Sequence, residues 1–132
     1  MDVFARATAL ARCTVLDGVP PAALLAIAER AAAVRLEAGE ALPLRTDAGD
    51  AVLVIASGRV SAGGAELGPG ALVGEVAALD EEAALPAATA LEPTEALRIF
   101  RDDFLDLLAE HGAAARALAR VLARRIRKGS LR

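Results

Sequence analysis

The 132-residue sequence contains no tryptophan or tyrosine, one cysteine and one histidine. Its three phenylalanines leave the core to aliphatic side chains, and we expect no binding site built on aromatic stacking. The single cysteine, Cys13, cannot form an intramolecular disulfide, which makes a reducing compartment the default expectation. One histidine and one cysteine also fall short of the three or four ligands of a usual zinc site. We therefore expect no metal site.

Catalytic patterns are missing as well. The sole histidine, His111, stands just before Gly112, where it is typical of a helix end rather than of a catalytic group. No Ser-His-Asp, Cys-His or paired-carboxylate pattern stands out along the chain. The sequence therefore predicts that the protein has no catalytic residues and is not an enzyme.

Long apolar stretches are also absent. No apolar run reaches the roughly 18 residues of a membrane-spanning helix. Residues 1–20 contain Asp2, Arg6, Arg12 and Asp17, where a signal peptide would be apolar. These observations predict a cytoplasmic protein without a membrane span.

Positive charge is missing from one long stretch, because no Arg or Lys occurs between Arg59 and Arg98. Within this stretch lies the segment LGPGALVGEVAALDEEAALPAAT, residues 67–89. Three glycines allow its backbone to approach a ligand closely, and an acidic side chain, Glu75, follows the third. The pattern is typical of a loop and short helix that hold a small anion, yet the segment supplies no cation.

The cations gather instead at the C-terminal end of the sequence. The net charge is −3, which argues against non-specific nucleic-acid binding. Residues 113–132 carry +7 without one acid, which leaves −10 on residues 1–112. The cations are Arg116, Arg120, Arg124, Arg125, Arg127, Lys128 and Arg132. A basic helix on an acidic body predicts either a solvated helix face or a docking surface.

Hydrophobic periodicity divides the chain into helical and extended parts. Its length suits one domain over residues 1–132. Apolar residues at helical spacing predict helices within 1–31 and again within 102–128. Between them, short apolar stretches broken by Gly, Pro and Asp predict about eight strands over 32–100, with a short helix near 75–79. Closure into a barrel or roll would protect the edges of such short strands.

Local signals refine this assignment at three places. Gly63-Gly64, between two short apolar runs, predicts a tight hairpin. Asp102 or Asp103 is expected to cap the helix that follows the strands, and Gly112 to end it in a left-handed conformation. The last helix, from residue 113 to about 128, repeats the apolar residues Leu118, Val121, Leu122 and Ile126 on one side.

Several motifs, taken in order, resemble the cyclic-nucleotide-binding domain family. These are the turn Ala38-Gly39-Glu40, the strand pattern Ile55-x-Ser57-Gly58-x-Val60, the segment LGPGALVGEVAAL and the helices RDDFLDLLAEHGAAARALARVLARRI. The resemblance runs over nearly the whole chain. It implies a mainly β fold, a β-roll or jelly roll (double-stranded β-helix) with N-terminal helices and two C-terminal helices.

The same resemblance implies a ligand site of known plan. In the family, backbone N–H groups of a phosphate-binding cassette hold the cyclic phosphate, a Gly-Glu pair binds the ribose hydroxyl, and an arginine neutralises the phosphate. Here the implied ligand-binding residues are Gly74, Glu75, Val76, Ala77, Ala88 and Thr89. Counted back from Ala88-Thr89, the arginine position falls on Pro86, and counted forward from Glu75 it falls on Ala84 or Leu85, so no alignment places a cation there. Nearby Asp80, Glu81 and Glu82 would further disfavour a phosphate.

Two functions therefore remain open. In the first, the chain is a regulatory domain whose binding of a cyclic nucleotide, cAMP or cGMP, is weak, altered or lost. In the second, it is an interaction module that docks an effector protein or a second copy of itself through the basic residues Arg116, Arg120, Arg124 and Arg127. Only GSLR follows the last helix, so we expect no DNA-binding domain in this chain.

Overall fold

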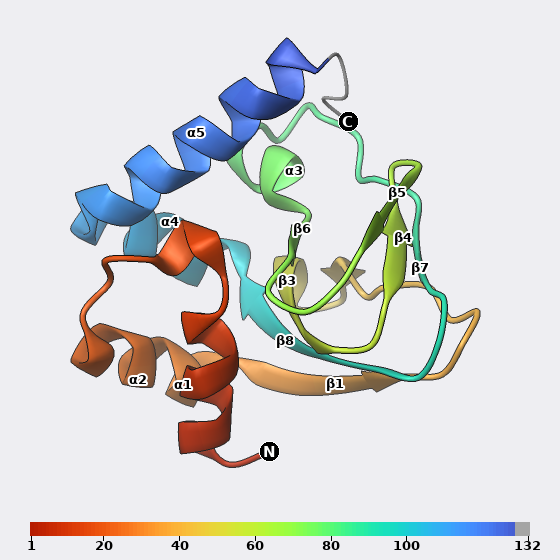
Figure 1. Cartoon of the computed structure of the whole chain (residues 1–132), viewed down its shortest axis with the longest axis horizontal. Coiled ribbons are helices and arrows are strands. Elements are labelled where there is room, and N and C mark those ends of the chain that lie inside the picture. Colours follow the sequence, from red (N-terminus) through yellow and green to blue (C-terminus); the bar gives the residue numbers. More distant parts are fainter. Residues whose placement is uncertain (129–132) are drawn as a thin grey trace.

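The computed structural model describes residues 1–128 and has strands in the middle of the chain with helices before and after them. Figure 1 shows the helices gathered on one side of the molecule and the strands on the other. Arg132, the last cation of the predicted basic tail, lies outside the described residues. Within residues 1–128, no helix combines the length and the apolar character needed to cross a membrane.

The N-terminal part contains α1 (Val3–Ala11), the one-turn 3-10 helix η1 (Thr14–Leu16) and α2 (Pro21–Arg30). Asp2 caps α1, because its Oδ1 accepts a hydrogen bond from the Ala5 N–H at 2.7 Å. Phe4, one of the three phenylalanines, does not belong to the core, since the residue is 68% exposed. Leu10 and Ala9 occupy the buried side of α1 instead, so the core is even more aliphatic than the composition suggested.

The strands form two antiparallel sheets that enclose a roll. The larger sheet has the order β1-β8-β3-β2 with β6 paired to β3, and the smaller sheet has the order β5-β4-β7. Their bounds are β1 (Ala32–Leu36), β2 (Arg45–Thr46), β3 (Gly49–Ser57), β4 (Val60–Ala62), β5 (Ala65–Leu67), β6 (Leu72–Val73), β7 (Ala88–Ala90) and β8 (Thr94–Phe100). The Gly63-Gly64 hairpin lies between β4 and β5, and the predicted fold class is confirmed.

Strand β3 separates two hydrophobic clusters. Because side chains alternate along a strand, Val52 and Val54 pack into the cluster shared with the helices, whereas Leu53 and Ile55 pack inside the roll. All four side chains are fully buried. This explains why the sequence has an unbroken apolar run here instead of an alternating one, and it fixes the helices against the outside of the roll.

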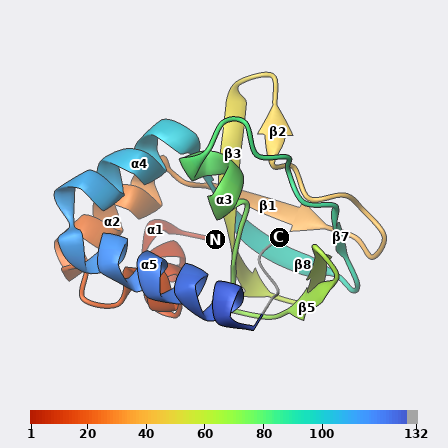
Figure 2. The same ribbon diagram turned by 90° about the horizontal axis from the view of Figure 1, so that it is seen from above.

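Three helices follow from the second half of the chain: α3 (Glu75–Leu79), α4 (Arg101–Glu110) and α5 (Gly112–Arg127). Figure 1 shows α5 running past α3, and Figure 2, the view from above, shows the helices beside the strands. Neither Asp102 nor Asp103 caps α4, and Gly112 begins α5 without a left-handed φ. Asp103 pairs with Arg30 of α2 at 2.9 Å instead, which ties the two groups of helices together.

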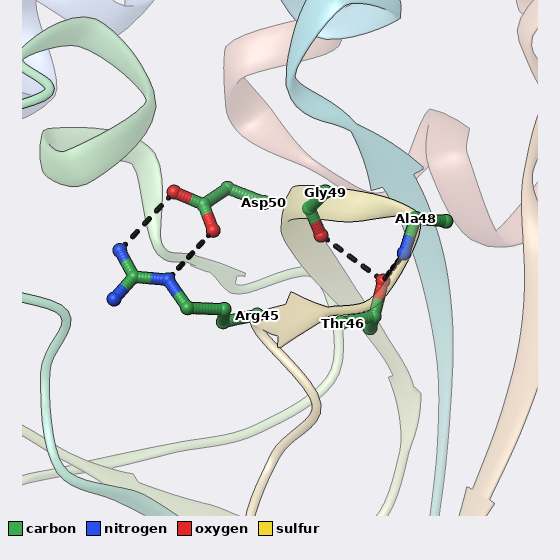
Figure 3. A network of polar contacts seen from close by, with 5 residues as sticks. All are labelled: Arg45, Thr46, Ala48, Gly49 and Asp50. Atoms are coloured by element: carbon green, nitrogen blue, oxygen red, sulfur yellow. Dashed lines mark hydrogen bonds and ion pairs between the residues drawn. The ribbon is translucent and has the colours of Figure 1, made fainter.

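A polar hairpin joins β2 to β3 at the far end of the larger sheet (Figure 3). Arg45 pairs with Asp50 across it, with its Nε 2.8 Å from Oδ1. The Thr46 hydroxyl donates to the Gly49 carbonyl at 3.0 Å and accepts from the Ala48 N–H at 3.2 Å. The turn is thus closed by side chains, since the strands here pair over only two residues each.

Candidate functional site

A cavity of about 240 Å³ lies between the β4–β5 hairpin, α3 and α5. Its volume falls below the roughly 300–1,000 Å³ of typical ligand pockets, so a larger ligand requires one wall to move. The lining residues are Ala62, Gly63, Gly64, Ala65, Leu67, Leu72, Val73, Gly74, Glu75, Val76, Pro86 and Arg125. Most of the wall comes from the strands of the roll and from the segment between Gly74 and Pro86, which corresponds to the cassette, and Arg125 of α5 completes it.

Gly74 allows the backbone to turn from β6 into α3 at the cavity wall. Its φ is +94°, a left-handed value that disfavours residues with a Cβ atom. A Cβ atom here would also stand 3.1 Å from the Leu44 side chain and 3.2 Å from the Ala51 carbonyl oxygen. The glycine therefore serves the fold at this position, and it places Glu75 at the first position of α3.

Glu75 carries the buried charge of the site. The residue is 3% exposed, yet its carboxylate pairs with the Arg125 guanidinium, which comes from α5 50 residues later. The Arg125 side chain is 29% exposed. A carboxylate removed from water requires such a partner, since an unpaired buried charge is strongly destabilising. The ion pair therefore joins the C-terminal helix to the cassette.

A second arginine holds the other end of α3. The Nε atom of Arg101, at the start of α4, donates to the Ala78 carbonyl at 2.8 Å, and its Nη1 lies 3.2 Å from a Glu81 carboxylate oxygen. Asp80, Glu81 and Glu82 are exposed and do not line the cavity. The three carboxylates therefore do not contact the cavity, and any effect on a phosphate there would act at a distance.

The six ligand-binding residues predicted from the sequence fall into three groups. Gly74, Glu75 and Val76 line the cavity. Ala77 is buried within α3. Ala88 and Thr89 belong to β7, where they pair with Ala62 and Ser61 of β4, and neither lines the cavity. Strand β7 thus contributes to the roll behind the site rather than to its surface.

Pro86, one of the positions at which the family resemblance implies an arginine, lines the cavity, whereas Ala84 and Leu85 do not. It lies in an irregular segment between α3 and β7. The one cation in the described part of the cavity wall is Arg125. In the sequence Arg125 belongs to the basic run, and its role at the site is hidden there because 50 residues separate it from Glu75.

A signal for Arg125 was present in the helix periodicity. It follows Leu118 and Leu122 at spacings of seven and three residues, which puts it on the face of α5 that packs against the body. Leu118 is buried and Leu122 partly buried. Ile126, expected on this apolar side, is 64% exposed instead. An arginine on the packed face of a helix indicates an acidic partner in the body of the protein, since a charge removed from water requires one.

The four predicted docking residues lie along the exposed side of α5: Arg116, Arg120, Arg124 and Arg127. No ion pair involves any of them within residues 1–128. Their charge therefore faces outward and differs in setting from that of Arg125.

Comparison with known proteins agrees with this architecture. A sequence model of the cyclic nucleotide-binding domain matches residues 33–111. The catabolite activator protein of Thermus thermophilus is 34% identical, with a TM-score of 0.71 over 89% of this chain and 60% of that one. The chain therefore belongs to the cyclic nucleotide-binding domain family, as its motifs predicted. A comparison with curated protein sequences gives no match.

Two kinase regulatory subunits share the fold at lower identity. The regulatory domain of Toxoplasma gondii protein kinase A, solved with cAMP, is 17% identical, with a TM-score of 0.76 over 92% of this chain and 50% of that one. The regulatory subunit of a cAMP-independent protein kinase A from Trypanosoma brucei, as a triple mutant bound to cAMP, is 21% identical, with a TM-score of 0.73 over 90% and 48%. The chain thus spans 48 to 60% of the length of these three proteins.

Proposed function

We propose that this chain is a regulatory domain that binds a cyclic nucleotide, such as cAMP or cGMP, with altered and weakened affinity, and that it acts by binding rather than by catalysis. Family membership supports the ligand class. The observation that carries the altered affinity is Pro86 at the cavity wall, where the family places its phosphate-binding arginine. Losing a charge-assisted hydrogen bond costs roughly 1.5–3 kcal/mol.

The proposed ligand position follows from the cavity. Glu75 would accept a hydrogen bond from a ribose hydroxyl, since it is the acidic side chain on the described wall. Because the cavity is small, the ligand would have to displace part of its wall. We expect α5 to be the part that moves, since a single ion pair in the described part of the chain, Arg125 with Glu75, joins it to the cassette. A ligand that favours one position of α5 would shift the helix population accordingly.

Titration with cAMP and cGMP tests this proposal by thermal shift. A ligand at about 100 times its dissociation constant adds about 2.7 kcal/mol of stability, so millimolar nucleotide should raise the melting temperature of the wild type. Glu75→Ala should bind roughly tenfold more weakly, because the ribose contact is lost. Glu82→Ala, which removes an exposed carboxylate outside the cavity, is the matched control.

Two outcomes contradict parts of the proposal. If Glu75→Ala binds the nucleotide with unchanged affinity, the proposed contact between Glu75 and the ribose is wrong, and the proposed regulatory function stays. No shift of the wild type with either nucleotide would leave the second candidate, an interaction module. The outward arginines of α5, Arg116, Arg120, Arg124 and Arg127, favour that candidate, because they offer an unpaired basic face within the described residues to an acidic effector or a second copy.

A further inference from the structure

The cavity wall contains one acidic and one basic side chain among the described residues, Glu75 and Arg125. Together they are close to neutral, whereas Glu75 alone would repel a phosphate diester, which carries one negative charge. A phosphate entering this cavity therefore meets a balanced pair. The balance depends on a residue of α5, outside the cassette.

The guanidinium of Arg125 has more donors than its contact with Glu75 uses. Its Nη1 donates to Oε1 of Glu75, which is its one hydrogen bond to the described part of the chain. A guanidinium has five N–H donors in a rigid planar fork, suited to hold two oxyanions at once. The second oxygen of Glu75 likewise stays free to accept from a hydroxyl. The same pair can thus bind a phosphate and a neighbouring ribose hydroxyl.

Position on the helix separates Arg125 from its neighbours. Arg124 and Arg127 are exposed, whereas Arg125 is partly buried and reaches the cavity. Its cavity also contains Pro86, the residue at the position of the missing cassette arginine. Pro86 and Arg125 lie far apart in sequence, and both line the same cavity.

We infer that Arg125 is the phosphate-binding residue of this chain and replaces, from α5, the arginine missing at Pro86. The inference rests on the proposed function and specifies its ligand chemistry, a phosphate next to a ribose hydroxyl. The cation then belongs to a helix outside the roll, so phosphate binding depends on α5 being in place.

Calorimetric titration with cAMP and with adenosine, which lacks the phosphate, tests the inference. Arg125→Gln should lower cAMP affinity about ten- to a hundredfold, as expected for losing a charge-assisted bond. Its adenosine affinity should stay equal or rise, because Glu75 is released. Lys128→Gln, which removes an exposed cation of the same basic run outside the cavity, should leave both affinities unchanged. Arg125→Lys should be intermediate for cAMP, since lysine keeps the charge without the fork.

A rescue experiment separates phosphate binding from a structural role. Pro86→Arg in the Arg125→Gln background should restore at least tenfold in cAMP affinity while leaving adenosine unchanged. Circular dichroism checks that each variant is folded. Absence of rescue in a folded double variant, or equal or tighter cAMP binding by Arg125→Gln, overturns the inference and leaves the proposed function in place. Absence of cyclic-nucleotide binding by the wild type overturns both.

Discussion

Arg45 and Asp50 close the β2–β3 hairpin from opposite strands. The hydrogen bond from Arg45 holds the pKa of the Asp50 carboxyl below its ordinary value of 3.8. A carboxyl with a lowered pKa in the folded state stabilises that state above the ordinary value, and the contribution disappears as the pH falls through the folded-state pKa. Both side chains are accessible to water, so the effect of the pair is small and weakened by salt.

Replacing Asp50 tests this pH dependence. Asp50→Asn should lower the free energy of unfolding slightly at pH 7, and the difference from the wild type should shrink below about pH 4 as Asp50 becomes protonated. Urea unfolding between pH 7 and pH 2.5 measures both. Arg45→Gln should behave in the same way, and additive effects in the double variant would contradict a contribution from the pair.

Cys13 provides a second test at the scale of single residues. The residue is 1% exposed, and burial raises the pKa of its thiol. Since the thiolate is the reactive form, the native protein should react with a thiol reagent at pH 8 at least about tenfold more slowly than the protein in guanidinium chloride. A native rate equal to the unfolded rate would show that the segment after α1 opens readily.

Turns between elements depend on close backbone contacts as well as on φ. Gly58 connects β3 to β4 with φ +92°, and a Cβ atom there would stand 2.4 Å from the Thr94 hydroxyl oxygen and 2.6 Å from the Pro93 carbonyl oxygen. Gly64, in the β4–β5 hairpin, has a similar φ of +84° but no atom within 4 Å of such a Cβ. The two positions separate the cost of backbone conformation from that of crowding.

The corresponding alanine variants should differ in stability. Gly64→Ala should cost about 1–2 kcal/mol, the usual cost of a left-handed conformation. Gly58→Ala should cost at least about 2 kcal/mol more, since the β8 strand must also move. Chemical denaturation measures both, and equal losses in the two variants would mean that the β8 strand moves aside without cost.

The elements themselves were largely predictable from the sequence, whereas contacts between them were not. Periodicity and the Gly63-Gly64 pair are local signals, and they gave the helices and the hairpin correctly, whereas the resemblance of several motifs gave the family. Capping by Asp102 or Asp103 failed because α4 begins at Arg101, which places both residues inside the first turn, and Asp103 pairs with the distant Arg30. Arg125 stayed hidden for the same reason, since only the fold brings it to Glu75. At the site, Gly74 and Glu75 were predictable because they lie within one motif.

Across the whole molecule, stability is expected to be uneven. The central strands β3 and β8 are buried on both faces. By contrast, the buried residues of α5 end at Leu118, after which the helix has partly buried side chains and the contact with Glu75. Local opening should therefore be easiest in the second half of α5.

Hydrogen exchange tests this difference. Amides of β3 and β8 should exchange only through global unfolding, and amides of residues 119–128 considerably faster. Saturation with cAMP should slow exchange in residues 119–128 more than in residues 112–118. Uniform protection along α5 without ligand would contradict this picture of the molecule.

The contact between Glu75 and Arg125 has a thermodynamic consequence for any partner of α5. With the phosphate cation on this helix, a protein that binds the outward arginines and shifts α5 also changes the affinity of the cavity. Linkage is reciprocal, so the ligand changes the affinity for that protein by the same factor. Binding of the ligand to the cavity and of a partner to the outward arginines would thus be cooperative. The cooperativity would be positive if the partner moves α5 so that Arg125 stays in the cavity, and negative if it moves Arg125 away.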